Sequence, residues 1–234
     1  MPRFHMIKAV VKGSLIWIFY ISLAACAQTT AVKPQSDTTA LQVLPATAKM
    51  DTTYFWEIMD DAFRKGGFNN KRKEDAILTA LTRLTPQQIM DFEIIFQQKI
   101  DESNTWNNMA AQTIIEGGSS DDRFYYFRCW LISLGKKNFY ETLRNPDHLA
   151  SLDIPVNKEH HYGEVLFEEL IPLSDQAYGI VTKKQVADDS FPRANASKKG
   201  LYFDSGGETK GKEWEDDKEL LKIAPLLSGK FKII

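Results

Sequence analysis

Residues whose types could do chemistry follow one another in the middle of the chain, between positions 117 and 128. Backbone N–H groups and serine hydroxyls at the start of a helix can bind a small ligand, and carboxylates beside them can exchange protons. The same residue types also cap and lock a turn between two helices, so a ligand site and a structural corner both stay open. The candidate residues are Gly117, Gly118, Ser119, Ser120, Asp121, Asp122 and Arg128.

Arg128 falls on an apolar face of the helix that the serines begin. At about 100° per residue it shares this face with Phe124, Phe127 and Leu131, while aromatic side chains line the opposite face. A helix that is apolar on both sides is normally central and covered. Because a buried guanidinium needs a carboxylate to offset its desolvation, we expect an ion pair, and Asp121 is the nearest partner along the helix.

Other patterns that resemble reactive sites lack what the chemistry requires. The run 206–212 has phosphate-loop spacing, but Glu213 replaces the required Ser or Thr. His160 and His161 are adjacent, so they point in different directions, and no further ligand cluster joins them. Cys129 lies in a hydrophobic helical run and is expected to be a buried small residue. We therefore expect no catalytic residue, no metal and no cofactor.

The N-terminus has the layout of an export signal. Arg3, Lys8 and Lys12 precede an uncharged, largely apolar run over residues 13–25. A helix that crosses a bilayer needs about 20 consecutive apolar residues, and this run is shorter. The pattern favours a signal peptide over a membrane-spanning helix.

The run closes with Leu23-Ala24-Ala25-Cys26, which resembles the lipobox of bacterial lipoproteins. The resemblance implies that residues 1–25 are removed and that Cys26 is diacylated, with a further acyl chain on the new N-terminus. Two or more acyl chains give stable membrane attachment. Ala27 stands where an aspartate tends to mean inner-membrane retention, which favours the outer membrane if the organism has one. A secretory signal cut nearby and an uncleaved anchor are the alternatives.

The charge left after cleavage bears on partners. Removing residues 1–25 takes away three basic residues and no acidic one, which leaves 26 Lys and Arg against 31 Asp and Glu. The formal net charge changes from −2 to −5. Without a basic stripe, a nucleic-acid partner is not expected. The expected partners are the membrane, reached through the lipid anchor, and a protein or small molecule that the sequence does not identify.

Composition divides the mature chain in two. Residues 26–49 combine the lipidated cysteine with a segment rich in Thr, Ala, Gln, Ser and Pro, which predicts a flexible tether. Residues 50–234 have the length and apolar content of one globular domain. The predicted organisation is a signal peptide over 1–25, a tether over 26–49 and a helical domain over 50–234.

Hydrophobic spacing in the domain predicts helices with short connections between them. Asp51 can cap a first helix that ends at Gly66 and Gly67, and Thr85 with Gln88 has the spacing of a capping box. Helices are predicted after 51, after 69, from 85 to 100, from 106 to 115, after 120, over 165–181 and over 217–223.

The last third of the domain is less regular. Gly, Lys, Ser and Asn dominate residues 188–213, which are consistent with a loop or a short β-hairpin that uses Leu201-Tyr202-Phe203 as a strand. Pro172 interrupts the helical pattern over 165–181 and would kink the helix or start a second one. The expected fold class is mainly α, a compact multi-helix domain.

Several motifs together resemble the bacterial domain of unknown function 4240, over about residues 50–180. The resemblance implies a mainly helical fold and assigns no catalytic residues. The family tends to have Asn at the position of Glu116 and Cys at that of Ser119. The matching motifs are Phe55-Trp56-x-x-Met59-Asp60, Leu84-Thr85-Pro86-Gln87-Gln88-Ile89, Gly117-Gly118, Ser120-Asp121-Asp122-x-Phe124-x-x-Phe127-Arg128-x-Trp130-Leu131-Ile132, Gly135-Lys136-Lys137-x-Phe139 and Asn145-Pro146-Asp147.

Three hypotheses about function follow from the sequence. The favoured one is a non-catalytic envelope module that binds a protein or a small molecule. The first alternative is an envelope enzyme that uses Asp121 or Asp122 with Arg128, and a weaker one is protection against a competitor's toxin. The enzyme hypothesis requires these side chains to converge in a water-accessible pocket, whereas the module hypothesis predicts that Arg128 is covered and paired.

Overall fold

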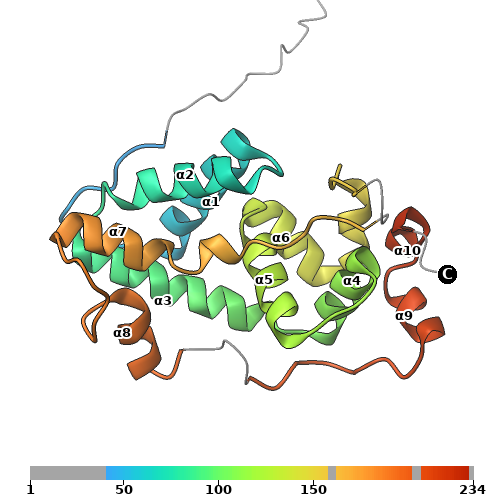
Figure 1. The fold of residues 1–234 in the computed structure, drawn as a ribbon. Helices are drawn as coiled ribbons and strands as arrows, with labels where there is room; N and C mark the ends of the chain where they lie inside the picture. The colour runs from blue at the N-terminus through green and yellow to red at the C-terminus, as the bar shows by residue number, and fades with distance from the viewer. Residues whose placement is uncertain (1–40, 158–161, 202–206, 232–234) are drawn as a thin grey trace, which may run out of the picture. The chain divides into compact units, whose positions relative to one another are not determined.

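The computed structural model describes residues 41–157, 162–201 and 207–231. Within these residues the domain is built from helices, as predicted (Figure 1). The predicted signal peptide, Cys26 and most of the predicted tether lie outside the described residues. The helices are α1 (Thr52–Gly66), α2 (Asn70–Leu81), α3 (Pro86–Glu102), α4 (Trp106–Glu116), α5 (Asp121–Ile132), α6 (Gly135–Arg144), α7 (Leu173–Thr182), α8 (Pro192–Lys198), α9 (Asp217–Ile223) and α10 (Pro225–Phe231), with 3-10 turns at Pro146–Ser151 and Glu168–Leu170.

Local capping signals set the helix ends that the sequence predicts. The Asp51 carboxylate accepts a hydrogen bond from the Tyr54 N–H at 2.9 Å and begins α1. At α3, the Thr85 hydroxyl and the Gln88 side chain each bind the other residue's backbone N–H, which forms the predicted capping box. Gly117 ends α4 in the left-handed conformation, with φ 71°.

The core is aromatic and centres on α5. Most of α5 is buried, which confirms that a helix apolar on both sides is central and covered. A ring contact joins it to the turn between α1 and α2, where Phe68 lies with its centroid 6.4 Å from that of Trp130. Beside it, the centroids of Trp56 on α1 and Phe139 on α6 are 5.0 Å apart. In Figure 1, α5 and α6 lie between α1, α2, α3 and α7 on one side and α4, α9 and α10 on the other.

The last third differs in part from the prediction. Residues 192–198 form α8 inside the stretch expected to be a loop or hairpin, because Pro192 suits the first turn and the Arg193 N–H is held by Asp175 at 3.0 Å. The residues Tyr202 and Phe203 of the predicted strand lie outside the described residues, and Leu201 is in no helix or strand. The helical part of 165–181 begins only at Glu168, and Pro172 directly precedes α7.

Two short backbone pairings hold segments that are not helical. Val156 and Gly163 form an antiparallel bridge, so the residues before 158 and after 161 run side by side. Thr105 and Lys210 form a parallel bridge that attaches the segment before α9 to the start of α4. Among the described residues, no helix is long and apolar enough to span a bilayer.

Candidate functional site

Arg128 does not pair with Asp121. Its guanidinium donates to the carbonyl oxygens of Phe124 at 3.4 Å and of Ile100 at 3.3 Å, and its side chain is 5% exposed. It also lies over the rings of Phe124 and Tyr125, with the guanidinium carbon 4.8 Å and 5.4 Å from their centroids. Asp121 is exposed on the first turn of α5, and no ion pair of Arg128 occurs among the described residues.

The expected ion pair is therefore wrong, for a reason in the geometry. The last carbonyls of α3 have no partner within their own helix, so the Ile100 carbonyl can accept from Arg128. The carbonyl and the two rings together cover the guanidinium, although burial still lowers the pKa of Arg128. The three side chains of the enzyme hypothesis, Asp121, Asp122 and Arg128, do not share a pocket, because the carboxylates are exposed and the arginine is covered.

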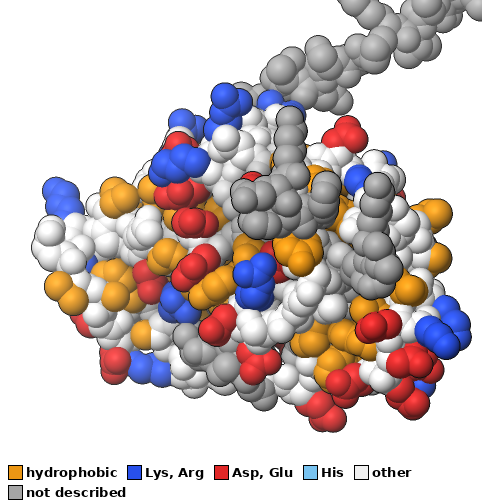
Figure 2. Space-filling view, turned by 45° about the vertical axis from the view of Figure 1, so that its right-hand side comes forward, with side chains coloured by type: hydrophobic (Ala, Val, Ile, Leu, Met, Phe, Trp, Pro, Cys, Tyr) orange, Lys and Arg blue, Asp and Glu red, His pale blue; other side chains and the backbone are white. Residues whose placement is uncertain are grey.

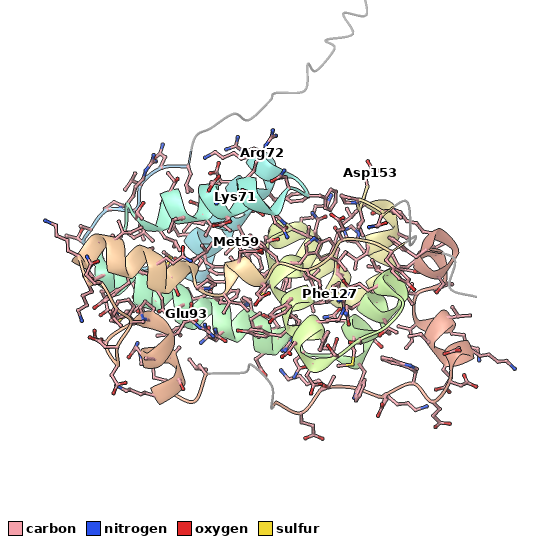
Figure 3. All side chains as sticks on the ribbon, viewed as in Figure 1. Met59, Lys71, Arg72, Glu93, Phe127 and Asp153 are labelled. Carbon is pink, nitrogen blue, oxygen red and sulfur yellow. The ribbon has the colours of Figure 1, made fainter. Side chains whose placement is uncertain are left out.

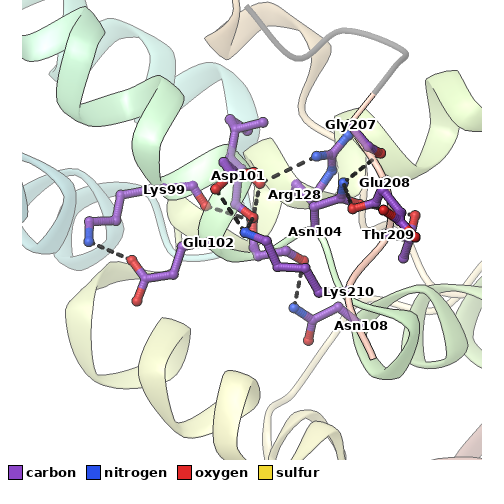
Figure 4. A network of polar contacts seen from close by, with 12 residues as sticks. Lys99, Asp101, Glu102, Asn104, Asn108, Arg128, Gly207, Glu208, Thr209 and Lys210 are labelled. Atoms are coloured by element: carbon purple, nitrogen blue, oxygen red, sulfur yellow. Dashed lines mark hydrogen bonds and ion pairs between the residues drawn. The ribbon is translucent and has the colours of Figure 1, made fainter. Parts of the chain in front are cut away.

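The end of α3 is also the centre of a polar network (Figure 4). Lys210 donates to the carboxylate and to the carbonyl of Asp101, each at 2.8 Å, and Asn104 donates to the Gly207 carbonyl at 3.1 Å. These contacts attach residues 207–210 to the turn between α3 and α4. The contacts are enough to hold this segment in position, so no bound ligand is needed to explain them.

The corner between α4 and α5 is built around Gly117. A side chain at this position would place its Cβ 2.4 Å from the ring of Tyr162, so the glycine lets Tyr162 pack directly on the corner. The Ser120 hydroxyl accepts from the Arg123 N–H at 3.3 Å and caps α5, as expected of a helix start. The structural interpretation of the corner therefore accounts for Gly117 and Ser120.

Four further side chains at the corner form a polar chain that the sequence did not predict. Gln112 is fully buried and donates to the Glu116 carboxylate, and its carbonyl oxygen accepts from the Ser119 hydroxyl. The other oxygen of Glu116 pairs with Arg123 at 3.0 Å. The spacing of four between Gln112 and Glu116 was visible in the sequence, but the pairing with Arg123 depends on the angle between α4 and α5.

A pocket of about 310 Å³ opens beside this chain. The corner supplies one wall, α2 supplies Asn70, and the rest comes from Asn157 and the segment after residue 161. Gly163 lies so close to α4 that a Cβ would stand 2.3 Å from Ile115, which brings this segment against the corner. The lining residues include Asn70, Glu116, Arg123, Asn157, Tyr162, Gly163, Glu164, Val165 and Leu166. We call this the Glu116 pocket.

Asn70 leaves an acceptor without a partner in this pocket. Its amide nitrogen donates to the Leu166 carbonyl at 2.6 Å, which fixes the orientation of the side chain. The Oδ1 atom is buried and has no hydrogen-bond partner among the described residues. A buried acceptor is costly to leave unpaired. Asn70 lines the pocket, but its Oδ1 atom is closed off from water, so a donor in the pocket reaches it only if the Asn70 side chain shifts.

The electrostatics of the pocket combine one cation with two carboxylates. Burial raises the pKa of the Glu116 carboxyl, while the contacts of Gln112 and Arg123 lower it. Glu164 is exposed at the rim, and Arg123 is about half exposed. The arrangement can hold a small polar group by hydrogen bonds and charge.

Two other buried groups have strongly shifted pKa values. Lys73 is fully buried, donates to the Ser133 hydroxyl at 2.7 Å, and has its pKa lowered by burial to about 7. Its neighbours Lys71 and Arg72 point outward from α2 (Figure 3). A serine beside a lysine of low pKa could act as a nucleophile, but Ser133 is also fully buried, so no substrate reaches it in this structure.

The second buried group is Glu93 on α3, on the side toward α7 and α8 (Figure 3). It accepts from Ser174 at 2.6 Å and from Gln97 at 2.7 Å, and burial raises its pKa to about 7. Cys129 is likewise fully buried and burial raises its pKa, which agrees with a structural residue rather than a reactive thiol. These groups lie between packed helices and do not line the Glu116 pocket.

Metal ligands do not gather in the part of the chain that is described. Among those residues no group of three or more His, Cys, Asp and Glu side chains could hold a metal ion. His160 and His161 lie outside the described residues.

Fold and site define a helical domain with a small polar pocket at the α4–α5 corner. The sequence matches the family described as "Protein of unknown function (DUF4240)" over residues 50–179, more than half of the chain, and the protein belongs to this family. This match confirms the resemblance found from the motifs. Comparison with curated proteins gave no match, and comparison with solved structures gave none either.

Proposed function

We propose that this chain is a bacterial envelope lipoprotein whose helical domain is a non-catalytic binding module. Lipid on Cys26 anchors it, in the outer membrane where there is one, and the Glu116 pocket holds the ligand. The ligand is a small polar molecule or a polar side chain of a partner protein. The proposal assigns no acid–base chemistry to the pocket.

The observation that carries this proposal is the unpartnered Oδ1 of Asn70 in a pocket of about 310 Å³. Buried polar atoms are nearly always hydrogen-bonded, so we infer that the Asn70 side chain shifts to meet a donor from outside the domain, which completes the site. Glu116 and Arg123 are already held in place by each other and by Gln112, which makes the wall rigid before a ligand arrives. Arg128 is covered, as the module hypothesis predicts, but its contacts are carbonyl oxygens and aromatic rings and not the paired carboxylate that the hypothesis also predicts.

A photo-crosslinker in place of Tyr162 tests the proposal in intact cells. Tyr162 lines the pocket and is 49% exposed, so the probe faces any occupant. The matched control carries the probe at Leu226 on α10, which is 68% exposed and lines none of the pockets described above. We expect a discrete adduct at 162 that is absent at 226.

A second variant assigns the adduct to the site. Asn70→Ala removes the unpartnered acceptor, so it should lower the yield of the adduct at 162 several-fold while the domain stays folded. The same products at both probe positions, or a yield unaffected by Asn70→Ala, would contradict the proposal.

A further inference from the structure

The C-terminal end of α7 exposes apolar and basic side chains together. Ile180 is 58% exposed and Val186 is 76% exposed. Between them lie Lys183 and Lys184, both exposed. We call residues 180–186 the α7 tip. Single exposed apolar residues are ordinary, but two of them within seven residues, with two lysines between, form an amphipathic surface.

The charge of this region is opposite to that of the mature chain. Residues 180–199 contain five Lys and Arg and two Asp, whereas the chain after the predicted cleavage has an excess of acidic residues. Asp188 lies 3.6 Å from Lys184 and neutralises part of this charge, but Lys183 is in no ion pair among the described residues. Figure 2 shows acidic and basic side chains mixed over one face, with exposed hydrophobic groups between them.

A hollow lies beside the α7 tip. Its volume is about 780 Å³, and its lining includes Ile180, Lys183, Lys184 and Phe191. The Lys184 ammonium lies 5.8 Å from the ring centroids of both Tyr178 and Phe191, so a cation and aromatic surface meet at the hollow. The lining also includes the Asp175 carboxyl, so the basic side chains of the hollow are Lys183 and Lys184 at its edge toward the α7 tip.

The segment that leads from the predicted tether into the domain lies at the same end of the domain as the α7 tip. Residues 45 and 48 accept hydrogen bonds from Gln88 on the first turn of α3, so the segment 41–49 lies on the junction between α2 and α3. Asn70, at the start of α2, contacts Leu166 just before α7, so α7 runs alongside α2 toward that junction. Figure 1 places the end of α7 and residues 41–49 together, away from α9 and α10.

We propose that the α7 tip docks on the anionic surface of the bilayer in which the chain is anchored. This inference rests on the proposed lipid anchor. Lysines near an anionic leaflet are attracted to it, and the side chains of Ile180 and Val186 enter the interface. These contacts are too few to bring an unanchored domain to the membrane. The anchor already holds the domain close to the bilayer, so weak contacts are enough to set the orientation of the domain on its surface.

Probe depth in vesicles tests the docking. The full lipidated chain carries a fluorophore on Val186→Cys or, as a matched control, on Leu226→Cys at the far end of the domain. Cys129 is fully buried and Cys26 is acylated in the proposal, so the new cysteine takes the label. The vesicles are phosphatidylcholine with or without about one third phosphatidylglycerol, and spin-labelled lipids quench a probe that enters the interface.

Docking predicts at least twofold stronger quenching at 186 than at 226, and only with the anionic lipid. Lys183→Glu should remove the difference, whereas Lys218→Glu, a control on α9, should not. Equal quenching at both positions, or none at 186, overturns docking. If the protein dimerises without vesicles and the 186 probe is shielded in that dimer, docking is also overturned, and the α7 tip is the contact surface for a second copy of the chain. The mass of the mature N-terminus is measured separately, so loss of the anchor and loss of docking are distinguished.

Discussion

Single buried charges govern how this domain responds to pH. Lys73 has a neutral hydroxyl and the Phe167 ring for contacts, and its ammonium lies 4.9 Å from that ring centroid. Neither contact supplies a negative charge, so burial penalises the protonated form. Between pH 7 and 10.5 the unfolded chain binds a proton at this position that the folded domain does not, and the stability of the folded state therefore rises with pH over this window.

Replacing this lysine by an apolar residue should stabilise the domain. Lys73→Met keeps an unbranched side chain, one atom shorter, and removes the buried ammonium, and we expect a gain of about 2–4 kcal/mol at pH 6. The gain should shrink as pH rises above 7 and vanish near pH 10.5, because the wild-type lysine is then neutral in both states. Urea unfolding at several pH values measures it, and a loss of stability at pH 6 would show that the ammonium has a counter-charge.

The sequence did not predict how Arg128 is satisfied. It placed the arginine on a buried face correctly, because that follows from helical spacing alone. The acceptor is the carbonyl of Ile100, 28 residues earlier in the chain, and only the packing of α3 against α5 brings it there. The same holds for the ion pair of Arg123 and Glu116, because no pattern in the sequence predicts it.

Glu93 links two helices, because it accepts from Ser174 on α7 while Gln97, on its own helix α3, donates to its other oxygen. Its pKa is raised from 4.5 to about 7, so between these values the folded domain holds a proton that the unfolded chain has lost. Stability at this site therefore falls as pH rises through the window, opposite to the effect of Lys73.

Glu93→Gln should remove this loss. The amide keeps an acceptor for Gln97, and the Ser174 hydroxyl can turn to accept from the new amide nitrogen. We expect a gain of about 2–3 kcal/mol at pH 8 and no gain at pH 4, where the carboxyl is protonated in both states. Thermal unfolding of both proteins across this range checks it, and a constant difference at all pH values would refute the assignment.

The corner between α4 and α5 offers a matched pair of glycines. Gly117 has a positive φ and contacts Tyr162, whereas a Cβ at Gly118 meets nothing within 4 Å. Gly117→Ala should cost about 1–3 kcal/mol, from the left-handed backbone and the displaced ring, while Gly118→Ala should be near neutral. Denaturant midpoints compare the two, and equal effects would mean that the corner is not held by Gly117.

Helix ends set by local signals could be predicted, and those set by packing could not. The capping box at Thr85 and the stop at Gly117 depend on a few adjacent residues. The short helix α8 has Pro192 in its first turn but no capping side chain of its own, and it depends on Asp175 and on packing against α3. At this scale, the sequence predicts an element when the element contains its own start and stop.

For the whole molecule, the sequence identified the family and the corner but not the pocket. The candidate residues 117–122 lie next to it, yet its polar lining comes from Asn70, Glu116, Arg123 and the segment 162–166. Asn70 lies in an ordinary helix start, where its side chain gives no sign of a role. Only the fold, which joins α2 to the end of α4, assembles the site.

The proposed anchor determines where this pocket operates, and one measurement tests it directly. Cells that express the wild-type chain or Cys26→Ser are grown with labelled palmitate, and the immunoprecipitated proteins are compared. We predict label in a wild-type product that begins at Cys26 and fractionates with membranes, and no label in the variant. Equal label in both proteins, or an unlabelled wild-type product that retains Met1 and stays in the cytosolic fraction, would contradict the account.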